Sequence, residues 1–123
     1  MSWRDLLGTL FMKIGDSLPV PAAQVFADPF NYTLASLLRD NQRAPAALWA
    51  AVQQAFPGVV PADYAAIHQQ ISAAYTLAAD LASAVNKQQL RQDAARERLR
   101  QAFPQMAQAN RGSLLLQNLL DTR

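Results

Sequence analysis

The feature that most constrains the fold is the stretch from Pro61 to Phe103, which contains no glycine and no internal proline. Apolar residues recur in it at alternating steps of three and four, the heptad spacing of a helix that packs along a partner. This spacing predicts one long central helix from residue 61 to about residue 102, with an alanine-lined seam. The seam consists of Tyr64, Ile67, Ile71, Ala74, Ala78, Leu81 and Val85.

The seam weakens beyond Asn86, because two of its next positions are the glutamines Gln88 and Gln92. The helix either runs on past this point or breaks between residues 86 and 89. No true helix breaker occurs before Ala102, so we predict that the helix is continuous.

Shorter helices are predicted on both sides of this rod from their start and stop signals. Aspartate, serine and proline mark these starts because they cap or pre-form a first turn. The sequence thus predicts an all-α fold, a small bundle of about five helices around one long central helix, as a single domain over residues 1–123. The predicted starts of the shorter helices are Ser2, Asp28 with Pro29, Pro45 and, after a turn at Asn110-Arg111-Gly112, Ser113. The side chains predicted to be buried are Trp3, Leu7, Phe11, Phe30, Leu37, Trp49, Phe56, Ile67, Ile71, Leu81 and Leu116.

The residue content argues against most catalytic chemistry. The chain has no cysteine, four glycines and one histidine, His68. A metal site needs three or four ligands, and phosphate-binding loops and nucleophile elbows need glycine spacings that are missing here. Asp93 and Glu97 share a helical face, but the arginines around them indicate solvated ion pairs. We therefore predict that the protein is not an enzyme and has no catalytic residues, cofactor or metal.

Two further patterns bear on location and source. No apolar run approaches the roughly 18 residues that span a bilayer. The first apolar stretch is broken by Gly8 and Lys13, unlike a signal peptide. A cytoplasmic protein is the expectation, and the preference for arginine and alanine suggests a bacterial or phage gene.

Low charge favours association with another protein. Charged residues make up 16% of the chain, below the usual quarter or so, and weakly charged small domains tend to associate. An antiparallel hairpin or a twofold dimer would satisfy the heptad seam equally well. We predict a non-enzymatic adaptor, inhibitor or accessory protein that acts through helix–helix contacts, with coiled-coil packing in a homodimer. Its predicted contact surface combines the helix over residues 88–101 with the leucine-rich C-terminal helix, through Arg91, Arg98, Leu115, Leu116, Leu119 and Leu120.

The alternative is a small helical DNA-binding regulator. Phosphate contacts need cations clustered on one face. On a continuous helix Lys87, Arg91 and Arg98 project from one side, and Arg111 follows. Arg96 and Arg100 project from the other side, and the net charge of +2 is only weakly basic.

Overall fold

The computed structural model describes residues 23, 26–40 and 44–121, and this part of the chain forms five helices and no strand. The longest helix spans 26 residues and contacts three of the others, which confirms the predicted all-α bundle around one long helix. The predicted first helix, with Trp3, Leu7 and Phe11, lies outside the described residues. The helices are α2 (Pro29–Arg39), α3 (Pro45–Ala55), α4 (Pro61–Asn86), α5 (Gln92–Ala102) and α6 (Gln108–Asp121).

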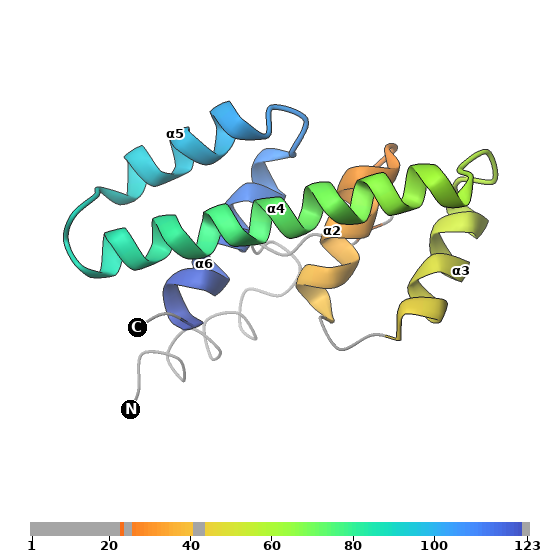
Figure 1. Ribbon diagram of the computed structural model, residues 1–123, viewed down its shortest axis with the longest axis horizontal. Helices are drawn as coiled ribbons and strands as arrows, with labels where there is room; N and C mark the ends of the chain where they lie inside the picture. The colour runs from red at the N-terminus through yellow and green to blue at the C-terminus, as the bar shows by residue number, and fades with distance from the viewer. Residues whose placement is uncertain (1–22, 24–25, 41–43, 122–123) are drawn as a thin grey trace.

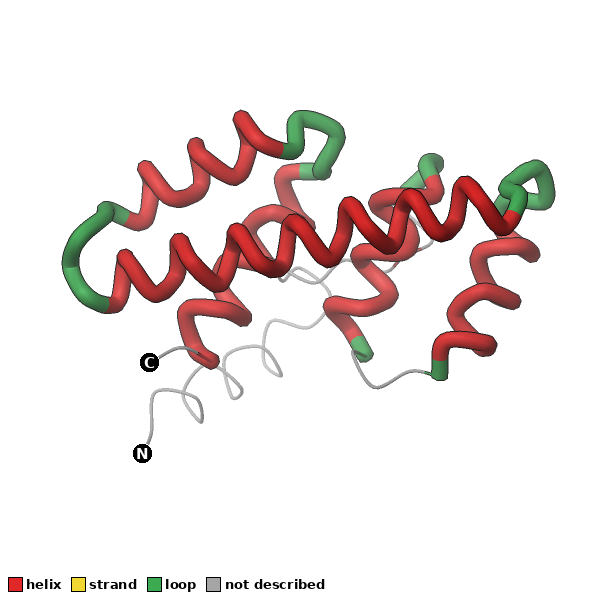
Figure 2. Tube along the Cα trace, in the orientation of Figure 1, coloured by secondary structure: helices red, strands yellow, loops and turns green. Residues whose placement is uncertain are grey.

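The other four helices are arranged around the long helix α4 (Figure 1). α5 runs back along the C-terminal half of α4, and α6 and α2 pack against α4 on another side. α3 stands at the N-terminal end of α4 and packs against α2. Figure 2 shows that short turns connect α3 to α4, α4 to α5 and α5 to α6.

Three helices begin at the prolines that the sequence marks. The Asp28 carboxylate accepts a hydrogen bond from the Asn31 backbone N–H at 2.9 Å, so Asp28 caps α2 ahead of Pro29. Pro45 and Pro61 hold the first positions of α3 and α4. A first-turn N–H has no hydrogen-bond partner within its own helix, so proline, which lacks this N–H, forfeits no hydrogen bond there. Its fixed φ is already the one a helix needs.

The alanine-lined seam of α4 is covered by this chain's own helices. Ile71, Ala74, Ala78 and Leu81 are buried in one cluster with side chains from α2, α5 and α6. Alanine at two of these positions lets the neighbouring backbones approach closely. The heptad pattern is therefore explained within one chain, and the seam by itself no longer argues for a dimer.

The predicted continuity of the central helix is wrong. α4 ends at Asn86, and α5 begins at Gln92. The Gln89 N–H donates to Ala84 O at 2.8 Å and the Gln88 N–H donates to Val85 O at 3.0 Å. These two bonds form a Schellman motif, in which the residue after the cap adopts a left-handed conformation. Here that residue is Gln88, with φ of 60°, and not the glycine that usually occupies this position.

Burial of α5 explains why the helix stops without a glycine. A left-handed conformation costs a non-glycine residue about 1–2 kcal/mol. Folding α5 back on α4 buries Leu99 completely and also Ala95. Full burial of a leucine contributes about 1.5–3 kcal/mol, which offsets that cost. A continuous helix would leave both side chains in water.

We expect Gln88→Gly to raise the free energy of unfolding by about 1 kcal/mol, because glycine adopts positive φ without steric cost. The midpoint of urea denaturation, followed by circular dichroism, measures this change. Gln89→Gly is the matched control, and its neighbouring position lacks the positive φ. Equal shifts in the two variants, or a lowered free energy of unfolding for Gln88→Gly, would show that Gln88 carries no strain.

The last helix also begins earlier than predicted. α6 starts at Gln108, so Asn110-Arg111-Gly112 is helical and is not a turn, and the buried Ser113 is not its cap. Asn110 belongs to a buried hydrogen-bond network that outweighs its turn preference. Among the predicted core residues, Phe30, Ile71 and Leu81 are buried, whereas the others that the structure describes are partly exposed. These are Leu37, Trp49, Phe56, Ile67 and Leu116.

Candidate functional site

The predicted nucleic-acid contacts lie in the segment that runs from the end of α4 through α5 to the first turn of α6, and we call this segment the basic end (residues 87–111). Lys87 caps α4 and Arg91 precedes α5, and both are exposed. Arg98 is exposed on α5, and Arg111 is partly buried on α6. The basic end carries six cations and two carboxylates. The helix break changes which of its cations face one another.

Both carboxylates of the basic end are engaged by arginines, as the sequence predicts. Arg91 Nε lies 3.4 Å from Asp93 Oδ1, with both side chains exposed. Arg100 Nε donates to Glu97 Oε2 at 2.9 Å. This hydrogen bond lowers the pKa of the Glu97 carboxyl and raises the pKa of the Arg100 guanidinium. Solvent screens such exposed pairs, so they contribute little to stability.

The four leucines of the predicted contact surface divide into two pairs. Leu115 is 1% exposed and Leu119 is 9% exposed, and both belong to the core cluster. Leu116 and Leu120 are one turn apart and partly exposed. A partner that binds the folded chain can reach only the second pair. Their role in binding stays a prediction.

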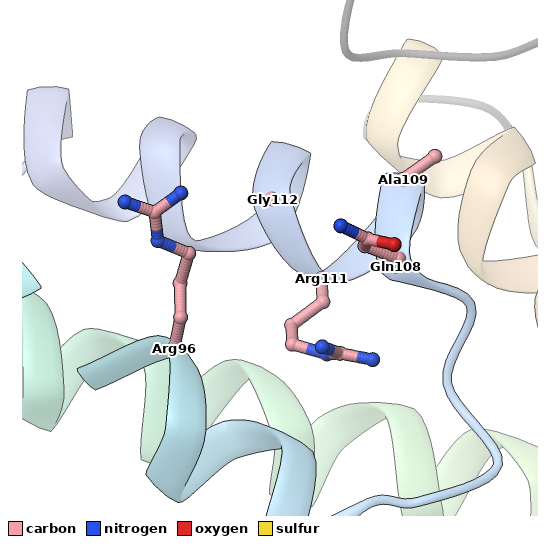
Figure 3. A pocket seen from close by; sticks show the side chains of 5 residues that line it. All are labelled: Arg96, Gln108, Ala109, Arg111 and Gly112. Atoms are coloured by element: carbon pink, nitrogen blue, oxygen red, sulfur yellow. The ribbon is translucent and has the colours of Figure 1, made fainter. Parts of the chain in front are cut away.

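A hollow opens between α5 and α6 at the basic end, and we call it the arginine hollow. Its volume is about 530 Å³. Figure 3 shows that Arg96 extends from α5 toward α6, while Arg111 extends from α6 toward α5, with the Gln108 carboxamide beside it. Arg111 Nη2 donates to Met106 O at 3.4 Å, and Arg111 Nε is buried without a hydrogen-bond partner among the described residues. The lining residues are Arg96, Gln108, Ala109, Arg111 and Gly112.

The sequence did not indicate that Arg96 and Arg111 share a site. On a continuous helix Arg96 faces away from the predicted cations and would lie far from α6. The break at Gln88 turns α5 back and brings Arg96 to the start of α6. No local pattern contains this information, because it depends on how two helices pack.

A second groove lies between α2 and α4 and is mostly apolar. It is lined by Leu37 of α2 and by Ile71, Tyr75 and His68 of α4, among others. Burial raises the pKa of the Tyr75 hydroxyl, so this phenol is neutral at neutral pH. The His68 ring stands edge-on to Tyr64, with centroids 4.6 Å apart. Such a groove accepts apolar groups, and Ser72 and Thr76 also line it.

A third surface, which we call the alanine-rich end, covers α3 and residues 58–73. Residues 44–79 carry one charged side chain, Asp63. Val60 is 51% exposed, and the rings of Trp49 and Tyr64 contact each other at a tilt of 45° with centroids 4.6 Å apart. α3 buries only two side chains, and the small residues on its remaining sides face solvent. The exposed alanines of this end are Ala46, Ala47, Ala50, Ala55, Ala62, Ala65, Ala66 and Ala73.

The described residues hold neither a metal-binding cluster nor a membrane-spanning helix. They contain no group of three or more histidine, cysteine, aspartate or glutamate side chains that could hold a metal ion. None of the helices α2 to α6 combines the length and hydropathy needed to cross a bilayer.

Comparisons with protein-family models, curated proteins and solved structures found no match to this chain. Any functional conclusion therefore depends on the surfaces described above.

Proposed function

We propose that this protein is a non-enzymatic, helical protein-binding module of bacterial or phage origin, acting as an adaptor, inhibitor or accessory protein in the cytoplasm. The observation that carries the proposal is the alanine-rich end. Charged residues are depleted at the centres of protein interfaces, and aromatic residues are enriched there. Exposed Val60, with Trp49 and Tyr64 nearby, fits that composition.

The shape of this end supports the same proposal. α3 packs against α2 at one extremity of the described structure and leaves most of its surface open. Alanines on α3 and on the first turns of α4 would let a partner helix lie close to the backbone. The polar atoms of the basic end are hydrated or ion-paired, so they would desolvate at greater cost.

We expect the double variant Ala50→Glu with Val60→Glu to weaken partner binding at least tenfold, since each tenfold loss needs only about 1.4 kcal/mol of interface energy. Ala50 is an exposed helical position where glutamate is favourable, and Val60 is an exposed residue just before α4, so the fold should persist. Affinity capture from a lysate of the source cells, with the retained proteins identified, measures binding to other proteins. Sedimentation equilibrium measures self-association and so tests the homodimer.

Ala102→Glu is the matched control, because this exposed alanine of α5 lies away from the alanine-rich end. It should leave both capture and self-association unchanged. If wild-type protein is monomeric and retains no specific protein, or if all variants bind equally, the proposal is wrong.

A DNA-binding regulator is the second candidate, and the six cations of the basic end favour it. Binding through phosphates predicts retardation of a DNA duplex that weakens steeply with added salt. Exposed Lys87, Arg91 and Arg98 would make most of these contacts, with Arg111 beside them. Absence of retardation at low salt would exclude this candidate.

A further inference from the structure

We propose that the arginine hollow is a binding site for a small molecule that carries a phosphate group. The site is separate from the alanine-rich end and does not depend on partner binding there. Three features of the described residues support it: a positive charge that the protein only partly balances, a buried donor without an acceptor, and open space of suitable size.

The charge around the hollow is positive and only partly balanced by the protein, because the Glu97 carboxylate, hydrogen-bonded to Arg100, also interacts with the charge of Arg111. Arg96 and Arg111 both line it, and no carboxylate does. Asp93 and Glu97, the acids of α5, are engaged by Arg91 and Arg100. Figure 3 shows the two guanidinium groups at different places in the hollow, that of Arg96 beside α6 and that of Arg111 toward α5, so the site presents one cation at each. Guanidinium binds phosphate oxygens in a bidentate geometry, and a phosphate dianion can satisfy two such groups.

The buried donor is Arg111 Nε. Its N–H is removed from water and has no hydrogen-bond partner among the described residues. Arg111 Nη2 of the same guanidinium donates one long hydrogen bond, at 3.4 Å, to Met106 O. A buried donor without an acceptor destabilises the folded state, so a ligand oxygen that accepts from Nε would be bound favourably.

The start of α6 adds to the positive potential. Gln108 is the first residue of the helix, and it lines the hollow with Ala109. The unpaired N–H groups of a first turn and the helix dipole both favour an anion there. The Gln108 carboxamide lies beside Arg111 in Figure 3 and can orient a ligand through one further polar contact.

The available space fits a small molecule. The volume of about 530 Å³ lies within the ~300–1,000 Å³ of typical ligand sites. Gly112 contributes to this space, because a Cβ built there would meet no atom within 4 Å apart from its chain neighbours and the nearby backbone of its own helix. A larger side chain at this position would fill the hollow and would not disturb the packing of α6.

The test is a calorimetric titration of the full-length protein with inorganic phosphate and with pyrophosphate, at an ionic strength fixed with sodium chloride. ¹⁵N spectra of the arginine Nε–H groups follow the same titrations. Wild-type protein should bind with a shift of the Arg111 Nε–H signal. Arg96→Gln should weaken binding roughly tenfold or more, since it removes a charge-assisted contact from an exposed side chain.

Two further variants make the result specific. Arg98→Gln removes the same charge from the same helix outside the hollow and should change binding less than about twofold, as expected for a screened distant charge. Gly112→Leu improves helix propensity and should abolish binding by occupying the hollow.

Three results would overturn the site. One is an absence of phosphate and pyrophosphate binding to wild-type protein. Another is an equal loss for Arg96→Gln and Arg98→Gln. The third is retention of binding in a folded Gly112→Leu variant. Retardation of duplex DNA without any binding of pyrophosphate would likewise assign the basic end to nucleic acid and exclude the small-molecule site.

Discussion

Replacing Leu99 by alanine is expected to lower the free energy of unfolding by about 3–5 kcal/mol, the range for a fully buried leucine that leaves a cavity. Leu99 is completely buried and joins α5 to the core cluster that α4 and α6 share. α5 buries only one other side chain, Ala95, so nothing else on this helix compensates for the loss. Urea denaturation followed by circular dichroism measures the change.

Arg98→Ala is the matched control for Leu99→Ala, because it truncates the preceding, exposed residue of the same helix. Its effect should stay within about 0.5 kcal/mol. Similar small effects for both variants would mean that α5 does not pack on α4 in solution. In that case the arginine hollow would not form either, since Arg96 reaches it only through this packing.

Replacing Asn31 by alanine is expected to cost about 2–4 kcal/mol, because it leaves buried polar groups without partners. The Asn31 side chain accepts from the Ala107 N–H at 2.8 Å and donates to Gln105 O at 2.9 Å. The buried Asn110 carboxamide donates to Asn31 Oδ1 at 3.0 Å. These bonds join the start of α2 to the turn before α6. Thermal and urea denaturation of the variant measure their contribution.

Gln117→Ala provides the control for Asn31→Ala. Its carboxamide makes one bond, to Leu38 O at 2.8 Å, and its loss should cost about 1 kcal/mol. Combining Asn31→Ala with Asn110→Ala tests the network directly. The double variant should lose less than the sum of the single losses, because removing one partner already disables the other. Additive losses would contradict a cooperative network.

The network also links stability to the arginine hollow. Asn31 fixes the backbone at Ala107, one residue before α6 begins. Gln108 and Arg111 then enter the hollow from the first turn of that helix. Phosphate binding by Asn31→Ala should therefore weaken even under conditions where most of the protein is folded.

The sequence by itself determined the fold class and most helix boundaries. Asp28, Pro45, Pro61 and the Phe103-Pro104 pair act on their immediate neighbours through capping or proline sterics, and the structure has helix ends at each of them. The heptad stripe likewise identified which face of α4 is buried, because that pattern follows from helix periodicity alone.

Only the tertiary structure decided where the central rod breaks, where the last helix starts and which arginines meet. Gln88 adopts a left-handed conformation because the burial of Leu99 offsets the free-energy cost of that conformation. Local helix propensity does not include this burial free energy. Asn110 is helical because Asn31, 79 positions away in the chain, bonds to it. Arg96 and Arg111 lie across one hollow for the same reason: contacts between distant segments are fixed by packing, and sequence spacing does not encode them.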